Sequence, residues 1–161
     1  MPRTARVDAV DRRIVAALQR DGRRPFTSIG RELGLSEAAV RQRVARLQAT
    51  GIMQVVAVAD PMTLGYQAIA MVGISVDGRA RRQVAEAVGR LPEVSYLVLT
   101  AGSFDMLAEV VCEDNDHLLR LLSDDLAGIE GVRDTETFMY LRLLKEAYTW
   151  SVDPEATADA G

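Results

Sequence analysis

Hydrophobic residues recur at helical spacing in three successive segments of the first fifty positions. We expect the first helix to begin after Asp8, a favoured N-cap residue, and to stop before Gly22. Thr27 is the predicted cap of the second helix, and Ser36 that of the third, which runs to Gly51. Three helices of this size form a minimal trihelical domain.

The second and third predicted helices have the spacing of a helix-turn-helix. They are hinged at Gly34, and the third carries an apolar ridge of Val40, Val44 and Leu47 with arginines beside it. A helix that buries one stripe and is basic elsewhere suits the major groove of DNA, where arginine reaches phosphates and guanine edges. The segment therefore indicates nucleic-acid binding.

After the third helix the pattern changes to strand-like periodicity. The valine-rich run 52–59 predicts a short strand or wing that closes the helical domain. From Tyr66 onwards, strands and helices alternate in the order βαββαβ. The predicted elements are a strand at 68–76, a helix at 79–91, strands at 94–100 and 105–112, a helix capped by Asp114 or Asn115 and reaching Leu126, and a strand at 132–140.

This order is that of the ferredoxin-like split, an antiparallel sheet with both helices on one face. The predicted fold class is therefore α+β, with an N-terminal winged helix-turn-helix joined to a C-terminal ferredoxin-like domain. The first strand is apolar on both sides, because Ile69 and Met71 alternate with Ala70 and Val72. Since the helices cover one face only, we expect the other to meet another subunit.

Charge is divided unequally along the chain. Residues 1–50 contain eleven arginines and five acidic residues, a net charge of +6, whereas residues 51–161 contain eight basic and eighteen acidic residues, a net charge of −10. The overall charge of −4 conceals this difference. A basic module joined to an acidic one favours nucleic-acid binding by the first part and another task for the second.

Several kinds of chemistry are disfavoured. One cysteine, Cys112, and one histidine, His117, allow neither a disulfide framework within the chain nor a cysteine metal site. Because no nucleophile–base pair or phosphate loop is evident, we expect no enzyme, no cofactor and no metal. The N-terminus lacks the apolar stretch of a signal peptide, and no segment has the roughly 20 apolar residues of a membrane helix. We expect a cytoplasmic protein.

Residues 7 to about 150 resemble the Lrp/AsnC (leucine-responsive, feast/famine) family of transcription regulators. The opening VDAVDRRIVAALQRDGR is similar to the first helix of that family, and LGLSEAAVRQRVARLQATGIM to its helix-turn-helix. The stretch LTAGSFDMLAEV is similar to the Gly-x-x-Asp turn of its effector domain, and IEGVRDTETFMYLRLLKE to its last strand. A helix-turn-helix alone is a weak signal, but its combination with βαββαβ and this turn is specific.

The resemblance implies a sequence-specific transcriptional regulator that responds to an amino acid or a related small metabolite. It also implies a dimer, often assembled into an octamer of four dimers, that binds double-stranded DNA at inverted repeats. The predicted domains are a DNA-binding domain with a linker strand at 1–60, an effector-binding and oligomerisation domain at 61–152, and a disordered tail at 153–161.

The start of the third helix is the part that enters the groove in this motif, so we expect Arg41 or Gln42 to contact a base or a phosphate. Arg43 and Arg46 flank the ridge and are expected to grip phosphates or pair with acids rather than read bases. An ordinary solvated helix face is the alternative. The predicted DNA-binding residues are Ser36, Glu37, Ala38, Arg41, Gln42, Arg43 and Arg46, with Arg23 and Arg24 in the loop before the second helix.

The turn at Gly102 occupies the place of the family's effector site. A free amino acid has an ammonium group that needs a carboxylate such as Asp105, and a carboxylate that needs N–H groups or hydroxyls such as Ser103. Glycine allows close backbone approach, although glycine, serine and aspartate are also preferred in ordinary hairpin turns. The predicted effector-binding residues are Gly102, Ser103, Asp105, Thr100, Thr135 and Thr137.

Two other functions remain possible at this stage. The first alternative is a ligand-binding, oligomeric module whose helical domain contacts protein rather than DNA. The second is a small ferredoxin-like enzyme that acts on an amino-acid-like compound. The charge division argues against the first. Little in the residue content supports the second.

Overall fold

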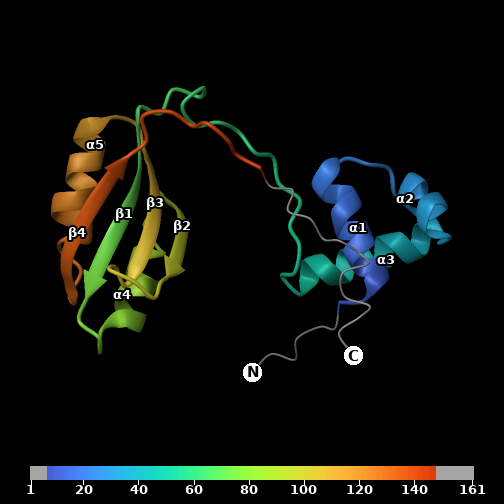
Figure 1. Ribbon diagram of the computed structural model, residues 1–161, viewed down its shortest axis with the longest axis horizontal. Helices are drawn as coiled ribbons and strands as arrows, with labels where there is room; N and C mark the ends of the chain where they lie inside the picture. The colour runs from blue at the N-terminus through green and yellow to red at the C-terminus, as the bar shows by residue number, and fades with distance from the viewer. Residues whose placement is uncertain (1–6, 148–161) are drawn as a thin grey trace. The chain divides into compact units, whose positions relative to one another are not determined.

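The computed structural model describes residues 7–147, which form two compact units, one of residues 7–58 with 145–147 and one of residues 59–144. The first unit contains helices α1 (Ala9–Arg20), α2 (Phe26–Leu33) and α3 (Glu37–Ala49) (Figure 1). The predicted tail at 153–161 lies outside the described residues. Within them, no helix is both long and apolar enough to cross a membrane.

Helix α1 begins where the sequence predicts because two aspartates cap it reciprocally. The Asp8 carboxylate accepts a hydrogen bond from the backbone N–H of Asp11 at 2.7 Å, and the Asp11 carboxylate accepts one from the N–H of Asp8 at 3.1 Å. This is a capping box with aspartate in both places. The helix ends at Arg20, ahead of Gly22, as expected.

The predicted Thr27 cap of α2 is wrong. The helix begins at Phe26, two residues earlier than a Thr27 cap implies, and Pro25 occupies the N-cap position. The Pro25 carbonyl accepts from the N–H groups of Ser28 and Ile29 at 2.9 and 3.2 Å. Proline has no N–H of its own and a restricted φ, which suit it to a helix start. Thr27 therefore lies in the first turn without capping it.

The turn between α2 and α3 depends on two glycines. Gly34 ends α2 with φ of 67°, a left-handed conformation that favours glycine. A Cβ at Gly30 would lie 2.6 Å from the carbonyl oxygen of Leu35, so only glycine lets the chain turn back this closely. Ser36 then caps α3 as predicted, accepting from the N–H of Ala39 at 3.2 Å.

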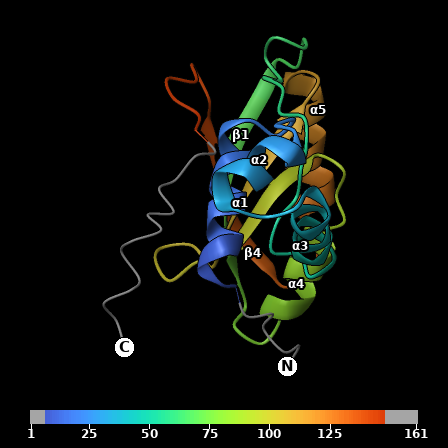
Figure 2. The same ribbon diagram turned by 90° about the vertical axis from the view of Figure 1, so that its right-hand side faces the viewer.

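The three helices, whose ribbons are seen from a second side in Figure 2, are held together by one apolar cluster. The predicted ridge of α3 is confirmed, since Val40, Val44 and Leu47 are all buried. Val40 and Val44 pack in a cluster with Ile14 of α1 and Ile29 of α2. Burial of the ridge fixes which side of α3 faces outwards.

An ion-pair network also joins α1 to α3. The Asp11 carboxylate is fully buried and accepts from Arg43 at 2.9 Å and from Arg46 at 2.5 Å. The carboxylate of Asp8 accepts from the same guanidinium nitrogen of Arg43 at 2.6 Å. Burial alone raises the pKa of Asp11, but the hydrogen bonds from Arg46, from the Asp8 backbone and from Arg43 outweigh it and hold that pKa below its ordinary value.

The predicted strand or wing at 52–59 does not form. None of the described residues before Ala68 is in a strand. The composition favours a strand, but a strand needs a hydrogen-bonded neighbour, and the first unit consists of helices. The side chains of Val55, Val56 and Val58 are consequently exposed.

The second unit is the predicted ferredoxin-like fold. Its strands are β1 (Ala68–Val76), β2 (Val94–Leu99), β3 (Met106–Cys112) and β4 (Val132–Met139). All neighbouring strands are antiparallel, in the order β2-β3-β1-β4 (Figure 1). The first strand therefore lies between the third and the last, as the βαββαβ order requires.

Two helices cover one face of this sheet. Helix α4 (Arg81–Val88) is shorter than the predicted 79–91, because its start lacks a side-chain cap and Gly89 follows its end. The predicted Asp114 cap of α5 (Asn115–Arg120) is confirmed, and a π-helical turn, η1 (Leu121–Leu126), continues that helix. Residues Val84, Leu118 and Leu121 pack in one core with the strands.

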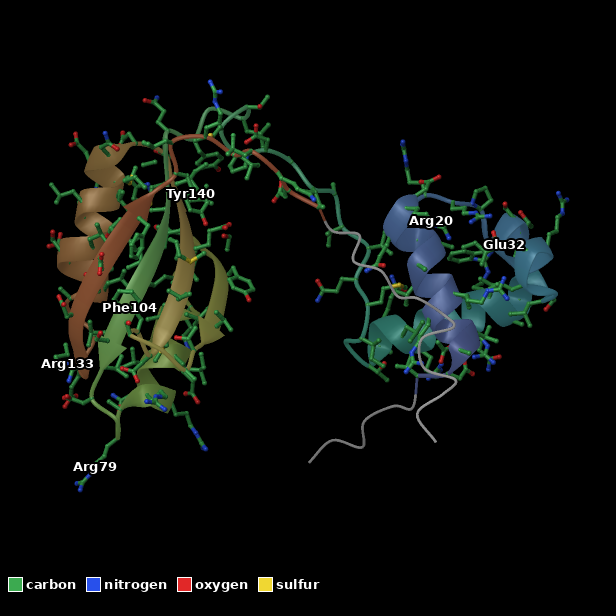
Figure 3. The ribbon with its side chains drawn as sticks, in the orientation of Figure 1. Arg20, Glu32, Arg79, Phe104, Arg133 and Tyr140 are labelled. Atoms are coloured by element: carbon green, nitrogen blue, oxygen red, sulfur yellow. The ribbon has the colours of Figure 1, made fainter. Side chains whose placement is uncertain are left out.

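The helices of the second unit leave the opposite face of the sheet uncovered, and the Phe104 ring lies on that face (Figure 3). The Phe104 ring sits over Gly73, where a Cβ would come within 2.6 Å of the ring, and meets Phe138 edge to face at 6.1 Å. At the Ile69 end, the hydroxyl of Tyr140 donates to Glu109 at 3.0 Å. Burial and this acceptor raise the Tyr140 pKa to about 12, so the phenol stays protonated near neutral pH.

The network of Asp8 and Asp11 predicts how the first unit responds to acid. Since their folded pKa values are lowered, their stabilisation is complete above about pH 4 and is lost as the pH falls through the folded values. We expect Asp11→Ala to lose about 1.5 to 3 kcal/mol at pH 7, and much less near pH 2. Hydrogen exchange of the α1 and α3 amides measures this unit separately.

Asp21→Ala is the matched control, since it removes an exposed carboxylate just beyond the same helix. Its effect should be small at both pH values. An equal loss of protection in Asp11→Ala at pH 7 and at pH 2 would show that the network does not contribute through charge.

Candidate DNA-binding and effector-binding sites

The outward face of α3 has uncharged side chains at its centre, and two of the three are alanines. Helical spacing places Ala38, Gln42 and Ala45 opposite the buried ridge, and all three are exposed. Alanines on both sides of Gln42 allow another surface to approach the helix closely. A glutamine amide can donate to and accept from one adenine edge, so this face suits contact with bases.

Arg41 lies beside this face and contacts one residue of its own helix and one of α2. Its guanidinium donates to Glu37, one turn earlier, at 2.5 Å, and lies 5.4 Å from the centre of the Phe26 ring. The Arg41 side chain is 65% exposed, and the pair is therefore weak in water. A DNA phosphate can replace Glu37 with little loss, while the ring keeps the guanidinium in place.

The sequence left two partners open for Arg43 and Arg46, namely phosphates or acids. In this structure both pair with acids of α1, through the network of Asp8 and Asp11. Neither lies at the centre of the exposed face. Their carboxylate partners were present in the sequence at helical spacing, but nothing in the pattern indicated how α1 and α3 cross.

The two arginines before α2 differ. Arg24 donates to Glu32 at 2.5 Å, and its hydrogen bond and charge lower the pKa of Glu32, with a smaller effect from Arg20 (Figure 3). The side chain of Arg23 is exposed, and its backbone N–H donates to Asp21. Of this pair, Arg23 is the more accessible to a phosphate.

In the second unit, residues 100–105 form a closed turn between β2 and β3. The Thr100 hydroxyl donates to the carbonyl of Phe104 at 2.6 Å, and the Thr100 N–H donates to that of Asp105 at 3.0 Å. Gly102 and Ser103 are exposed at its tip. Thr100 therefore shapes the turn, and the tip residues present their polar groups to the outside.

The Asp105 carboxylate is bound on two sides within the chain. It accepts from the N–H of Val76 at 2.9 Å and from Arg81 at 2.5 Å. The Val76 N–H and then Arg81 lower the pKa of Asp105, and the charge of Arg133 adds to this. A carboxylate has about four lone-pair sites, so two remain for an ammonium group.

Sequence reasoning missed Arg81. It comes from the first turn of α4, and its pairing with Asp105 places a guanidinium next to the predicted effector turn. Arg79 and Arg133 lie at the same end of the sheet, where β1 ends and β4 begins (Figure 3). The run Arg79–Ala80–Arg81–Arg82 was the available signal, since such a basic cluster next to an Asp turn suits an anionic group.

Thr135 and Thr137 do not belong to the turn. They lie on β4, opposite Ile74 and Val72, and both point to the helix-covered side of the sheet. β1 separates β4 from β3, which follows the turn. Both threonines are half-buried. The structure thus brings together Thr100, Gly102, Ser103 and Asp105 but not these two.

Comparison with known proteins agrees with this arrangement in both units. Residues 7–48 match the AsnC-type helix-turn-helix domain, and residues 69–150 match the Lrp/AsnC ligand-binding domain. An HTH-type transcriptional regulator of Pyrococcus abyssi is 34% identical over 91% of this chain and 93% of its own.

Two solved structures share the fold. The leucine response regulatory protein LrpA of Mycobacterium tuberculosis superimposes with a TM-score of 0.78 at 27% identity, over 86% of this chain and 95% of its own. A transcriptional regulator of Neisseria meningitidis in complex with L-methionine gives 0.77 at 24% identity, over 92% and 98%. The latter shows the fold alone. Because both family matches fall on the two units described above, the chain belongs to the Lrp/AsnC family of transcriptional regulators, with an N-terminal DNA-binding helix-turn-helix and a C-terminal ligand-binding domain.

Proposed function

We propose that this regulator acts in the cytoplasm as a dimer or a larger assembly, binds inverted repeats in double-stranded DNA through α3, and responds to an amino acid held at the turn 100–105. The observation that carries the proposal is the outward face of α3, which offers Gln42 between two alanines and an exchangeable arginine, Arg41, beside them. A dimer presents two such helices, so the half-sites lie about one helical turn or a multiple apart.

The uncovered face of the sheet supports self-association. Tyr96 and Phe138 are 55% and 44% exposed there, and the half-buried Glu109 and Met71 lie directly between them. The half-buried Leu107 lies on the same face, next to Gly73. An exposed apolar surface of this kind on a two-layer fold marks an interface. In a two-fold symmetric dimer, this face would pack against the same face of a second copy. Such dimers would then assemble further into an octamer.

The turn at Gly102 supports amino-acid binding. Asp105 keeps two lone-pair sites for the ammonium, and the backbone N–H of Ser103 and the guanidinium of Arg81 are donors for the carboxylate. The L-methionine complex of the Neisseria meningitidis protein favours an amino acid as the ligand class. Thr135 and Thr137 lie on the edge strand β4, on the helix-covered side of the sheet, and remain candidates for a second contact with an effector.

Substitution of the outward face of α3 tests DNA reading. Gln42→Ala should reduce binding to a duplex that the parent chain selects from a random pool more than binding to a mixed-sequence duplex. The expected loss of binding free energy is about 1 to 3 kcal/mol at one position of each half-site. Arg41→Ala should weaken binding to both duplexes, because it removes a positive charge that attracts the phosphates of any DNA as well as a contact to a phosphate or a base. Arg90→Ala, an exposed arginine just after α4, is the control. Unchanged gel-shift affinity in both α3 variants would remove this helix from the interface.

A charge on the uncovered sheet face tests self-association. Met71→Asp places a carboxylate between Phe138 and Glu109 of the neighbouring strands and should lower the molar mass in light scattering to that of a monomer at micromolar concentration. Gln83→Asp adds the same charge on an exposed position of α4 and should leave the mass unchanged. Retention of the parent mass by Met71→Asp would place the interface elsewhere.

The effector turn is tested with Asp105→Asn after a thermal-shift screen of the common amino acids. The substitution keeps an acceptor for the Val76 N–H but removes the negative charge that faces the ammonium. Loss of a charge-assisted hydrogen bond of about 1.5 to 3 kcal/mol should weaken effector binding roughly ten- to hundred-fold. Asp124→Asn, on the exposed side of η1, is the control. Calorimetry showing parent-like affinity in Asp105→Asn would leave Asp105 a turn residue.

A further inference from the structure

We propose that Asp11, with Asp8, determines the DNA specificity of this regulator by neutralising Arg43 and Arg46 on α3. The two carboxylates restrain these arginines from gripping the phosphates of any sequence. Discrimination is thereby left to the outward face of the helix. This inference rests on the proposed binding of DNA through α3.

The geometry of the network supports neutralisation. Two carboxylates face two guanidinium groups across α1 and α3, with nitrogen–oxygen distances of 2.5 to 2.9 Å in three ion pairs. The side chains of Arg43 and Arg46 are 31% and 38% exposed, so each guanidinium is turned partly inwards. The group of four therefore carries no net charge.

Asp11 cannot follow an arginine that leaves. Its side chain is fully buried, and one of its oxygens also accepts from the backbone N–H of Asp8 in the capping box. If Arg46 moved to a phosphate, the buried carboxylate would lose its closest partner, and an uncompensated buried charge is strongly unfavourable. A DNA phosphate must therefore compete with an anion that is already desolvated and fixed in place.

Arg41 provides the contrast on the same helix. Its partner Glu37 is 44% exposed and needs no compensation from a protein group when Arg41 leaves, because water replaces it. The helix thus carries one arginine that exchanges its partner readily and two that do not. Every phosphate contact adds to the attraction for all DNA, so fewer free arginines give a higher ratio of specific to non-specific binding.

The test compares salt dependence in the full chain. Asp11→Asn keeps the shape and one acceptor but removes the charge, which frees Arg46 and leaves Arg43 paired with Asp8 alone. Binding to a mixed-sequence duplex should become several-fold tighter at 0.1 M salt, and the slope of log K against log salt steeper by about 0.9 for each phosphate newly contacted. Affinity for a duplex selected by the parent from a random pool should rise less, so the specificity ratio falls.

Two further variants keep the inference open to refutation. Asp8→Asn retains a good N-cap and releases only Arg43 from one carboxylate, so its effect should be in the same direction and smaller. This variant decides the outcome if hydrogen exchange shows that Asp11→Asn is unfolded. Asp21→Asn changes the net charge of the chain by the same amount, because it removes one carboxylate charge at the other end of α1. The Asp21 carboxylate accepts from the backbone N–H of Arg23 and contacts neither Arg43 nor Arg46, so this variant controls for net charge alone.

Weaker binding or a shallower salt slope in Asp11→Asn and Asp8→Asn would overturn the proposal, because the carboxylates would then be preparing the arginines for phosphates. An effect equal to that of Asp21→Asn would also overturn it. Failure of the parent chain to bind any duplex is a different result, which would refute the DNA-binding function itself.

Discussion

The buried carboxylate of Asp11 links several properties of the first unit. An anion without contact to water requires positive partners and hydrogen-bond donors, and here they come from the start of its own helix and from two arginines of α3. Those arginines are one turn apart on the side of the apolar ridge away from Arg41. The same contacts that fix the crossing of α1 and α3 therefore decide which cations of the recognition helix remain available to DNA.

The second unit is organised by a comparable constraint at the turn 100–105. The Asp105 carboxylate fastens the end of β1 to α4, on one side of the sheet, through Val76 and Arg81. The adjacent Phe104 reaches the uncovered side, where the missing side chain of Gly73 leaves room for its ring. The turn 100–105 is therefore in contact with the helix layer through Arg81 and with the uncovered face through Phe104.

Local signals in the sequence were sufficient for most of the fold. Helix starts at Asp8, Ser36 and Asp114 were predictable because capping involves residues within three positions, and strand alternation gave the βαββαβ order. The Thr27 cap failed because Pro25 takes the N-cap position two residues earlier, where its carbonyl accepts the first backbone hydrogen bonds. The wing at 52–59 failed because strand formation depends on a neighbour, which composition does not reveal.

The sites were less predictable, since they depend on contacts across the fold. The turn residues Thr100 to Asp105 are close in sequence and were found together, whereas Arg81 approaches them only because α4 starts beside the end of β1. The position of Thr135 depends on strand order: β1 lies between β4 and the turn.

The same reasoning separates the arginines of α3. The sequence favours Arg41 for DNA contact because it lies near the start of the third helix, whereas it leaves both phosphates and acids open as partners of Arg43 and Arg46. What distinguishes them is the burial of the acid each one faces: Glu37 is half-exposed, whereas Asp11 is not exposed at all. The cost of leaving a carboxylate behind is small in water and large in the interior. The electrostatic character of the recognition helix is therefore set as much by α1 as by α3.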